Sequence, residues 1–371
     1  MKIIAYSMGD SNNPATWSNV PFYFIKALEA EGVEVVRVNV QPFSGKRNIR
    51  VLINKGLNAF KAGIPFERTS YYKKSVRRKM LKALKENPDA DLLLSFDFSS
   101  SIADKTDKKT MLFCDWDIKY LITQIDKRTP NEKEQALIEE QSKIIKGADY
   151  AVSIFPNAYE KMKEDYANLY YFGTPINLDE PQFDIDGALG ERYKNKRLLF
   201  IGKKKYLSGI KALYEAVENY NSKNESKFYI DLIGMTQEHT GINSEYVNHY
   251  GYLNKNNPEQ WKTYNDILRG AFFFVNTTDN WVGASSILDT AYLGIPCIIN
   301  PNPDLTKTFG DEIFFGYYCR DNTADEIEKY LKRLSELSEE EYTLLSSNAR
   351  VAVKGYTYPE YIKKILELIK S

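Results

Sequence analysis

The residues with the clearest capacity for chemistry lie between Asp279 and Ile299, where a polar loop leads into an apolar-periodic segment. Gly283, Ser285 and Ser286 fall where the first turn of a helix is expected, and Ser is also common there as a plain cap. Free backbone N–H groups and the positive end of the helix dipole favour an anion at that turn, most simply a diphosphate. Asp289 follows two turns later and is suited to accept hydrogen bonds from a hydroxyl pair of a ribose or sugar.

This segment resembles the nucleotide-sugar site of glycosyltransferases of the GT-B fold, in particular family 4. Their pattern is a Glu, seven residues, Glu-Ala and then a Gly-x-Pro strand. The run from Asp289 to Pro296 matches the second half of that pattern, with Gly294 at the expected helix end. Asp279 lies ten positions before Asp289 and is the candidate for the first acidic residue. The resemblance implies that Asp289 and Asp279 contact the ribose and sugar of the donor.

A cluster of cations follows the expected strand 197–201. Related enzymes carry Gly-Arg there, with a Lys five residues later, and both cations hold the diphosphate of the donor and stabilise the departing nucleotide. Lys203 occupies the Arg position, whereas Ser208 occupies the Lys position, so Lys204 or another nearby lysine is expected to replace it. The alternative is a solvated basic turn.

Two further loops are candidate binding elements. The first is similar to a Gly-x-Leu element that brackets the nucleotide base, with an ordinary turn as the alternative, and comprises Gly251, Tyr252 and Leu253. The second follows the first expected strand, at an edge where open α/β sheets bind ligands. Its candidates for contacts with the acceptor or sugar are Gly9, Asp10 and Ser11.

Asp115 and Asp117 follow an apolar strand at a point where related enzymes often carry His-Asp. Cys114 stands in place of that His, and the only two His residues of the chain are His239 and His249. We therefore expect Asp115 or Asp117 to orient or deprotonate the acceptor hydroxyl, since a carboxylate in a cleft can act as a base. Capping of a helix is the structural alternative for either residue.

The Asp-x-Asp form of this triplet binds a metal in glycosyltransferases of the GT-A fold. The same form recurs at 89–91 and 184–186, which makes it a weak signal. We predict no metal site and no cofactor, with the nucleotide sugar as co-substrate.

Alternating strands and helices, with near-continuous apolar strands, indicate an α/β chain with doubly wound parallel sheets. We predict two Rossmann-like domains that face a central cleft, the GT-B architecture. Residues 1–180 are expected to form the acceptor-side domain and residues 190–355 the nucleotide-sugar domain, with a linker over 173–197. The family resemblance implies that a terminal helix over 356–371 crosses back to the first domain.

A basic segment over 46–85 contains thirteen Lys or Arg residues against one acidic residue, although the net charge of the chain is zero. Its amphipathic stretches, 49–60 and 72–85, favour an anionic membrane surface over a solvated helix face or, least of all, nucleic acid. The residues predicted to contact the membrane are Lys73, Lys74, Arg77, Arg78 and Lys79.

The composition sets the remaining expectations. A chain of 371 residues with 43% hydrophobic residues can form two domains with cores of their own. Three cysteines suggest no disulfide framework, and no apolar run reaches the length of a membrane span or signal peptide. We therefore predict a cytoplasmic protein, peripheral at the inner face of the membrane.

Together these features predict a hexosyltransferase that moves a sugar from a UDP or GDP sugar to a glycan or lipid-linked acceptor in bacterial-type cell-surface polysaccharide or glycoconjugate synthesis. The resemblance implies retention of anomeric configuration without a metal. One alternative is a catalytically degenerate scaffold or partner subunit of the same fold that binds a membrane surface. The second alternative is a nucleotide-sugar epimerase, which the scarcity of His disfavours. The sequence leaves the oligomeric state open.

Overall fold

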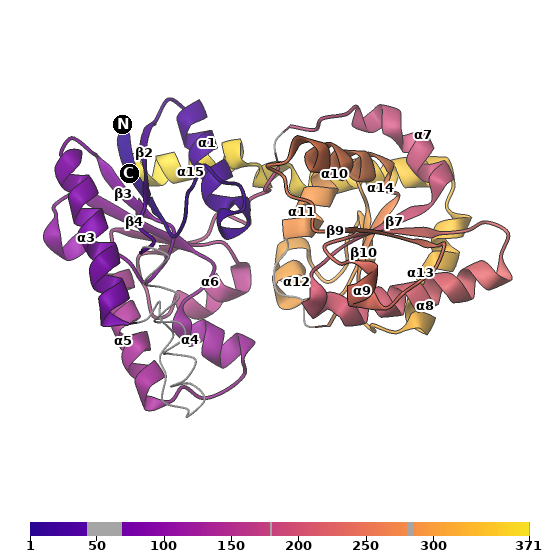
Figure 1. Cartoon of the computed structure of the whole chain (residues 1–371), viewed down its shortest axis with the longest axis horizontal. Coiled ribbons are helices and arrows are strands. Elements are labelled where there is room, and N and C mark those ends of the chain that lie inside the picture. Colours follow the sequence, from indigo (N-terminus) through magenta and orange to yellow (C-terminus); the bar gives the residue numbers. More distant parts are fainter. Residues whose placement is uncertain (43–68, 179, 280–284, 371) are drawn as a thin grey trace. The chain divides into compact units, whose positions relative to one another are not determined.

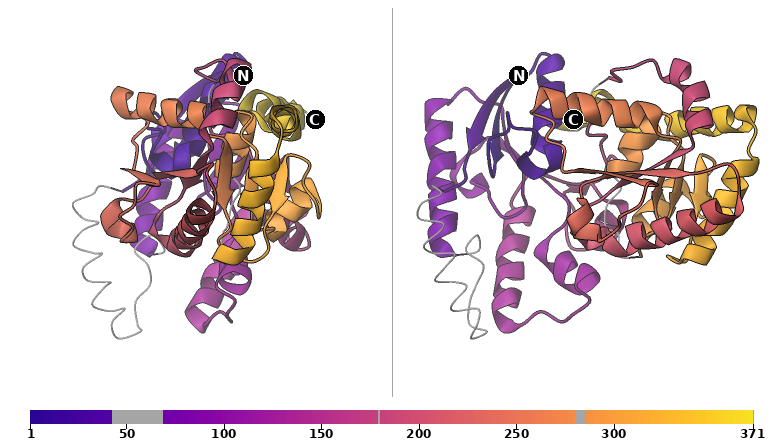
Figure 2. Two further views of the ribbon diagram at one scale, coloured as in Figure 1. Left: turned by 90° about the vertical axis from the view of Figure 1, so that its right-hand side faces the viewer. Right: turned by 45° about the vertical axis from the view of Figure 1, so that its right-hand side comes forward.

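The computed structural model describes residues 1–42, 69–178, 180–279 and 285–370. The chain divides into two compact units, the first comprising Met1–Gly173 with Ile362–Ser371 and the second comprising Thr174–Tyr361. Each unit contains a six-stranded parallel sheet flanked by helices (Figures 1 and 2). The prediction of two doubly wound parallel sheets is therefore confirmed.

The first sheet has the strand order β2-β1-β3-β4-β5-β6. Its strands are β1 (Lys2–Ser7), β2 (Glu34–Asn39), β3 (Leu92–Ser95), β4 (Lys109–Cys114), β5 (Tyr150–Ser153) and β6 (Leu169–Tyr170). The helices of this unit are α1 (Val20–Ala30), α3 (Ser70–Glu86), α4 (Ile118–Tyr120), α5 (Glu132–Lys146) and α6 (Pro156–Met162). β3 and β5 are buried throughout, as expected for strands covered on both faces. The strand order reverses between β1 and β3, which pair directly.

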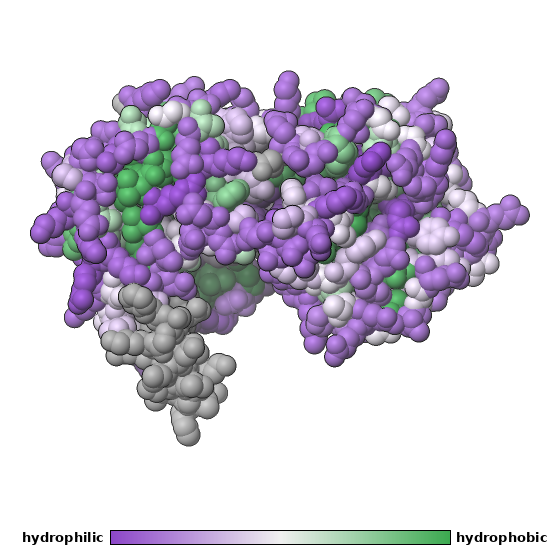
Figure 3. All heavy atoms as spheres, turned by 45° about the horizontal axis from the view of Figure 1, so that its top comes forward, coloured by the Kyte–Doolittle hydropathy of each residue, from purple (hydrophilic) through white to green (hydrophobic). Residues whose placement is uncertain are grey.

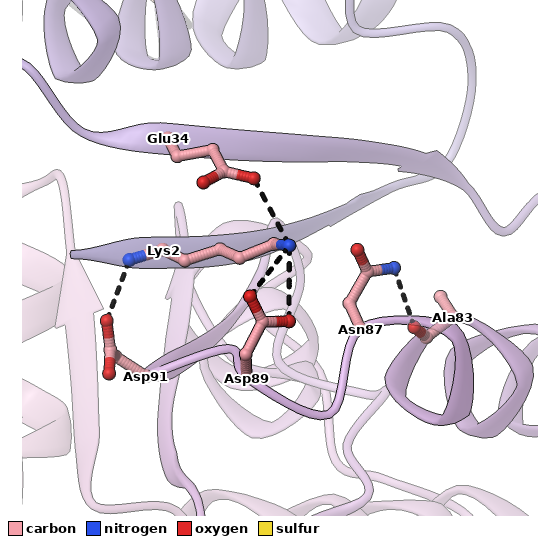
Figure 4. A network of polar contacts seen from close by, with 6 residues as sticks. All are labelled: Lys2, Glu34, Ala83, Asn87, Asp89 and Asp91. Carbon is pink, nitrogen blue, oxygen red and sulfur yellow. Dashed lines mark hydrogen bonds and ion pairs between the residues drawn. The ribbon is translucent and has the colours of Figure 1, made fainter.

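A polar network around Lys2 joins the amino-terminal ends of β1 and β2 to the turn before β3 (Figure 4). The Lys2 Nζ lies 3.2 Å from the Glu34 carboxylate and 3.1 Å from the Asp89 carboxylate. The Lys2 backbone N–H donates to Asp91 at 2.7 Å. Both members of this Asp-x-Asp pair therefore have a structural role, at the sheet edge opposite the carboxyl ends of the strands.

The second sheet has the strand order β12-β11-β10-β7-β8-β9. Its strands are β7 (Arg197–Ile201), β8 (Tyr229–Ile233), β9 (Val247–Gly251), β10 (Phe273–Asn276), β11 (Cys297–Ile299) and β12 (Gly316–Tyr318). The helices of this unit are α7 (Ile185–Asn195), α8 (Leu207–Lys223), α9 (Gln237–Thr240), α10 (Pro258–Gly270), α11 (Ser285–Tyr292), α12 (Pro303–Phe309), α13 (Ala324–Glu336) and α14 (Glu339–Val353). The order reverses between β7 and β10, which again pair directly.

The prediction of a linker over 173–197 is wrong for residues 185–195, which form α7. Asp184 caps this helix by accepting a hydrogen bond from the Asp186 N–H at 3.2 Å. The fully buried Arg192 donates to the carbonyl groups of Leu268, Arg269, Leu293 and Gly294. Because these carbonyls lie at the carboxyl ends of α10 and α11, the guanidinium group stabilises the negative ends of two helices. The sequence pattern did not predict this helix, because the helix contains two glycines and several charged residues.

The last helix, α15 (Tyr358–Lys370), begins in the second unit and belongs to the first unit from Ile362 onward. Its apolar residues recur at helical spacing, and Tyr361, Ile362 and Ile365 are buried. The helix therefore contributes core residues rather than a solvated tail.

The face of the molecule drawn in Figure 3 is largely hydrophilic. Among the helices that the structure describes, none combines the length and apolar character that a bilayer crossing requires.

Candidate functional site

The strongest candidate site lies at the carboxyl edge of the second sheet, between β7 and β10. Ligands of open α/β sheets bind where the strand order reverses, because the loops on either side of that point diverge and leave a crevice. The loop after β7 carries Lys203 and Lys204, and the loop after β10 leads through Asp279 to α11. A Cβ atom at Gly209 of α8 would lie 2.2 Å from the Thr278 Oγ1, so the absence of a side chain lets α8 approach the β10 loop.

The neighbouring strands end in glycines that bring their backbones together. Gly234 has a φ of +102°, and a Cβ atom there would lie 2.4 Å from the Gly202 carbonyl oxygen. The Gly234 N–H donates to the carbonyl of Gly251, the last residue of β9, at 2.7 Å. Tyr252 follows with 65% of its surface exposed, and Leu253 is half-buried. The three residues predicted for the nucleotide base thus lie at the same edge as the predicted cations.

Lys203 and Lys204 are both exposed in the short turn that leads into α8. Neither makes an ion pair within the described ranges of the chain. Both are therefore available to an anionic ligand. Lys205 differs, because its Nζ lies 4.7 Å from the centre of the Tyr206 ring.

Helix α11 begins at Ser285, and Ser285 and Ser286 are half-buried in its first turn. The first-turn N–H groups of a helix have no acceptor within the helix, and the dipole adds positive potential there. The start of α11 and the Lys203 turn come from the two loops that flank the reversal point. Gly283 lies outside the described residues.

Asp289 lies one turn before the end of α11 and is only 7% exposed. Its Oδ1 accepts a hydrogen bond from the backbone N–H of Asn177 at 2.9 Å. Burial raises the pKa of Asp289 to about 6, while the nearby Lys255 charge and the Asn177 N–H act in the opposite direction. The sequence patterns did not reveal Asn177 or Lys255 as neighbours of this carboxylate.

Asp279 follows β10 and is exposed. Its carboxylate lies 3.5 Å from the Asn300 Nδ2, and Asn300 follows β11 directly. Asp279 therefore lies on the same sheet edge as the other candidates. Asn276, the last residue of β10, was not predicted: its Oδ1 accepts from Thr278, and its buried Nδ2 has no partner in the described part of the chain.

The corresponding edge of the first sheet lies between β1 and β3. The loop after β1 contains the predicted residues Gly9, Asp10 and Ser11. The Asp10 carboxylate accepts from the Asn12 N–H at 2.9 Å, and the Ser11 carbonyl accepts from Arg37 at 3.1 Å. The first contact lies within the loop, and the second joins the loop to β2.

Three consecutive residues after this loop adopt left-handed backbone conformations. Trp17, Ser18 and Asn19 have φ values of 39°, 53° and 73°. Such conformations are costly for residues with side chains, and they cluster at functional sites. The result here is that the Trp17 ring contacts the rings of Phe96 and Phe113 at 6.3 and 6.1 Å between centroids.

The two carboxylates predicted for the acceptor side have different environments. Asp117 is buried and caps α4: its Oδ1 accepts from the Tyr120 N–H at 2.7 Å, and its Oδ2 accepts from the Tyr166 hydroxyl at 2.8 Å. Burial raises the pKa of Asp115 to about 6, and a hydrogen bond with the Trp17 side chain opposes this shift. Because both oxygens of Asp117 are held by the framework, Asp115 is the better candidate for a group that meets substrate.

A third carboxylate at this edge, Asp97, was missed at the level of sequence. It follows β3, and burial raises its pKa to about 6. The charges of Asp115 and Asp97 both raise the pKa of the Cys114 thiol, in addition to its burial, so the three groups lie close together. Asp97 also lines a cavity of about 330 Å³ together with Met8, Gln41, Tyr72, Lys73, Ser99, Ser100, Ile118, Leu137, Glu140, Gln141 and Ile144.

Comparison with solved structures relates the fold of this chain to a known architecture. The chain resembles sucrose-phosphate synthase from Thermosynechococcus elongatus with a TM-score of 0.67 and 14% identity, over 100% of this chain and 98% of the other. It resembles the Anabaena protein HepE in complex with UDP and glucose with a TM-score of 0.62 and 11% identity, over 100% of both chains. The chain has the GT-B fold.

Another structure with this GT-B fold is a Listeria monocytogenes protein described as a UDP-N-acetylglucosamine 2-epimerase, with a TM-score of 0.59 and 14% identity, over 100% of this chain and 96% of the other. No protein-family model matches the sequence, and no curated protein sequence matches it. Membership of glycosyltransferase family 4 therefore stays a prediction.

Helix α3 of this GT-B chain uses several of its predicted membrane contacts internally. Lys73 pairs with Glu140, Arg77 pairs with Asp104, and Lys79 donates to backbone carbonyls at the end of β2 and just beyond it. The exposed side of the helix instead presents a cationic stripe, which consists of Lys74, Arg78, Lys82 and Lys85. The part of the predicted basic segment over 46–68, including the stretch 49–60, lies outside the described residues.

Within the described part of the chain, no group of three or more His, Cys, Asp or Glu side chains is arranged to hold a metal ion.

Proposed function

We propose that the protein is a glycosyltransferase that moves a sugar from a nucleoside-diphosphate sugar to a hydroxyl group of a glycan or lipid-linked acceptor. The observation that supports this best is the carboxyl edge of the second sheet. There, exposed cations without an ion pair among the described residues, the amino-terminal end of a helix and a buried carboxylate belong to the loops and helix next to the point where the strand order reverses. This combination suits a ligand with a diphosphate at one end and a hydroxyl pair beside it.

Each group has a distinct role in the proposed donor complex. Lys203 and Lys204, with the first-turn N–H groups of α11 at Ser285 and Ser286, would hold the diphosphate and stabilise its charge as it departs. Asp289 would accept hydrogen bonds from the ribose hydroxyls. The base would lie against the backbone of the β9 end and Tyr252.

Acceptor chemistry is assigned to the first unit, with Asp115 as the residue that orients the acceptor hydroxyl and takes its proton. A carboxyl group with a pKa of about 6 is mostly ionised at neutral pH and is a stronger base than an exposed aspartate. The bond from the anomeric carbon to the phosphate oxygen breaks as the bond to the acceptor oxygen forms. Retention without a metal is proposed on the basis of the resemblance to family 4.

UDP sugars are the first donors to test, because HepE was solved with UDP and glucose. Calorimetric titration with UDP, GDP and ADP should give saturable binding to one of them. Lys203→Ala should weaken that binding by roughly 10-fold, because it removes one charged contact to phosphate. Lys223→Ala is the matched control, because Lys223 is likewise exposed but lies at the far end of α8 and pairs with Glu328. Absence of binding to all three nucleotides would contradict the proposal.

A nucleotide-sugar epimerase is the second candidate function, favoured by the structural likeness to the Listeria monocytogenes protein. The two activities leave different products. An epimerase yields a sugar of changed stereochemistry, either free or still attached to the nucleotide. A transferase instead releases the nucleoside diphosphate as the acceptor becomes glycosylated. Proton NMR of UDP-sugar incubated with the protein, with and without acceptor, distinguishes them.

The cationic stripe on α3 supports a further part of the proposal, peripheral association with an anionic membrane. Four exposed cations on one helix face, of which Lys82 also pairs with Glu86, offer electrostatic attraction of about 1 kcal/mol each near such a surface. A lipid-linked acceptor would be presented at the same surface.

A further inference from the structure

Asn177 connects the carboxylate of the donor helix to the segments where the chain passes between its two units. Its backbone N–H donates to the Asp289 Oδ1 at 2.9 Å, and its side-chain Oδ1 accepts from the Tyr358 hydroxyl at 3.0 Å. All three side chains are buried, with exposures of 3% for Asn177, 4% for Tyr358 and 7% for Asp289. Buried polar contacts of this kind have little freedom to rearrange one at a time.

Asn177 and Tyr358 lie close to the two points at which the chain crosses between its units. The chain leaves the first unit after Gly173 and returns to it at Ile362. Asn177 therefore lies just after the first crossing, and Tyr358 lies just before the second. The two segments also join through their backbones, because the Ile176 N–H donates to the Tyr356 carbonyl at 2.9 Å.

We propose that Asn177 and Tyr358 are positioning residues that orient the Asp289 carboxylate for the nucleotide and couple its occupancy to both crossing segments. This inference rests on the proposed donor site. Asn177 is held through the backbone before it by the Ile176–Tyr356 hydrogen bond and through its side chain by the Tyr358 hydroxyl. Its N–H in turn fixes the rotation of the Asp289 carboxylate.

The geometry also leaves one oxygen of Asp289 available. Within the described residues Asp289 makes a single hydrogen bond, through Oδ1. The remaining Oδ2 can accept from a ligand hydroxyl, while Oδ1 keeps the carboxylate plane in place. A ligand that draws the carboxylate toward itself would therefore act directly on the Asn177 peptide and, through it, on Tyr358.

A double-mutant cycle on nucleotide binding tests the proposal. Dissociation constants for the nucleoside diphosphate would be measured by calorimetry for the wild type, Tyr358→Phe, Asp289→Asn and the double variant. Tyr358→Phe should weaken binding by roughly 5-fold, the loss typical of one hydrogen bond. In the Asp289→Asn background the same change should have no further effect, because the group that Tyr358 positions has been altered.

Tyr193→Phe is the matched control, because it removes a hydroxyl that donates to the Leu337 carbonyl at 2.8 Å in the same unit. Its nucleotide affinity should equal that of the wild type. Hydrogen exchange supplies a second readout, since the peptide that contains 174–178 should exchange more slowly when nucleotide binds to the wild type. In Tyr358→Phe this slowing should be reduced.

The possible outcomes are distinguishable. If the wild type binds nucleotide and Tyr358→Phe binds equally well, or weakens binding by the same factor with and without Asp289, the positioning role is overturned. If nucleotide binding leaves exchange in 174–178 unchanged, the coupling is overturned. If the wild type binds no nucleoside diphosphate, the proposed function itself fails, and this inference fails with it.

Discussion

A Cβ atom on Gly234 would lie 2.4 Å from the carbonyl oxygen of Gly202, because the backbone just after β8 is in direct contact with the backbone just after β7. The positive φ of Gly234, +102°, adds a second reason why a side chain is not tolerated there. These two glycines lie at the sheet edge of the candidate donor site, where Gly202 directly precedes Lys203.

Gly234→Ala should therefore lower the free energy of unfolding by about 2–4 kcal/mol and weaken nucleotide binding, since the β7 loop must move. Urea denaturation and calorimetry would measure the two effects. Gly241→Ala is the control: Gly241 has a φ of +71° but no neighbour within 4 Å of the added Cβ atom. Gly241→Ala should lower the free energy of unfolding by only about 1 kcal/mol, because it forces a side-chain-bearing residue into a left-handed backbone conformation without creating a clash. Equal losses in the two variants would show that the contact with Gly202 is unimportant.

Nucleotide affinity should depend on pH through Asp289. Its pKa in the folded protein is about 6, so the carboxylate that accepts the ribose hydrogen bonds is charged above that pH and protonated below it. Affinity should thus fall as the pH decreases from 7 to 5. Asp289→Asn should bind weakly with no such dependence, and an unchanged pH profile in that variant would exclude Asp289 as the responsible group.

Asp115→Asn should separate activity from stability. We expect turnover to fall by roughly 100-fold, because a general base is lost. Since the pKa of Asp115 is raised from 3.8 to about 6 in the folded state, this carboxylate favours folding below pH 4 and loses that contribution as the pH rises through 6. The amide avoids this loss, so the variant should be more stable than the wild type by up to about 3 kcal/mol at pH 8.

Thermal unfolding at pH 8 and pH 4 would measure the predicted stability difference. Asp266→Asn, which removes an exposed carboxylate on α10, should change neither turnover nor its pH profile. A destabilised Asp115→Asn protein at pH 8 would contradict the account of its burial.

Binding to anionic vesicles should depend on the cationic stripe of α3. Replacement of its four cations by Gln should abolish cosedimentation with vesicles that contain phosphatidylserine at low salt, at a loss of about 1 kcal/mol per charge. A control with the same change of net charge would replace four exposed lysines of the second unit, namely Lys223, Lys262, Lys307 and Lys332. If both variants lose binding equally, net charge rather than this helix face is responsible.

Strands buried on both faces were the most predictable elements. β7 has the predicted bounds, Arg197–Ile201, because a parallel strand covered on both sides is a continuous apolar run that no surface face interrupts. Helices with polar first turns were less predictable. Helix α10, for example, starts at Pro258 and is capped by the Asn257 side chain. Its early turns carry too few apolar residues for the periodicity to extend there.

The candidate site was predictable where it depends on local sequence and not where it depends on tertiary contacts. Gly251 is the last residue of β9 and Lys203 lies two residues after β7, so their place at the sheet edge follows from the strand bounds. The Asn177–Asp289 hydrogen bond joins residues 112 positions apart, and no local pattern reports it. Asp97 could have been found, since it is the first acidic residue after the buried run of β3.

The division of α15 between the units has a consequence for biosynthesis. The first unit counts residues 362–371 among its own, and Ile362 and Ile365 are buried. On the ribosome, where N-terminal domains usually fold first, this unit cannot complete its packing until that segment has been translated and released from the exit tunnel. The second unit is contiguous in sequence and can fold earlier. The first unit is therefore synthesised before the second unit but completes its folding after it.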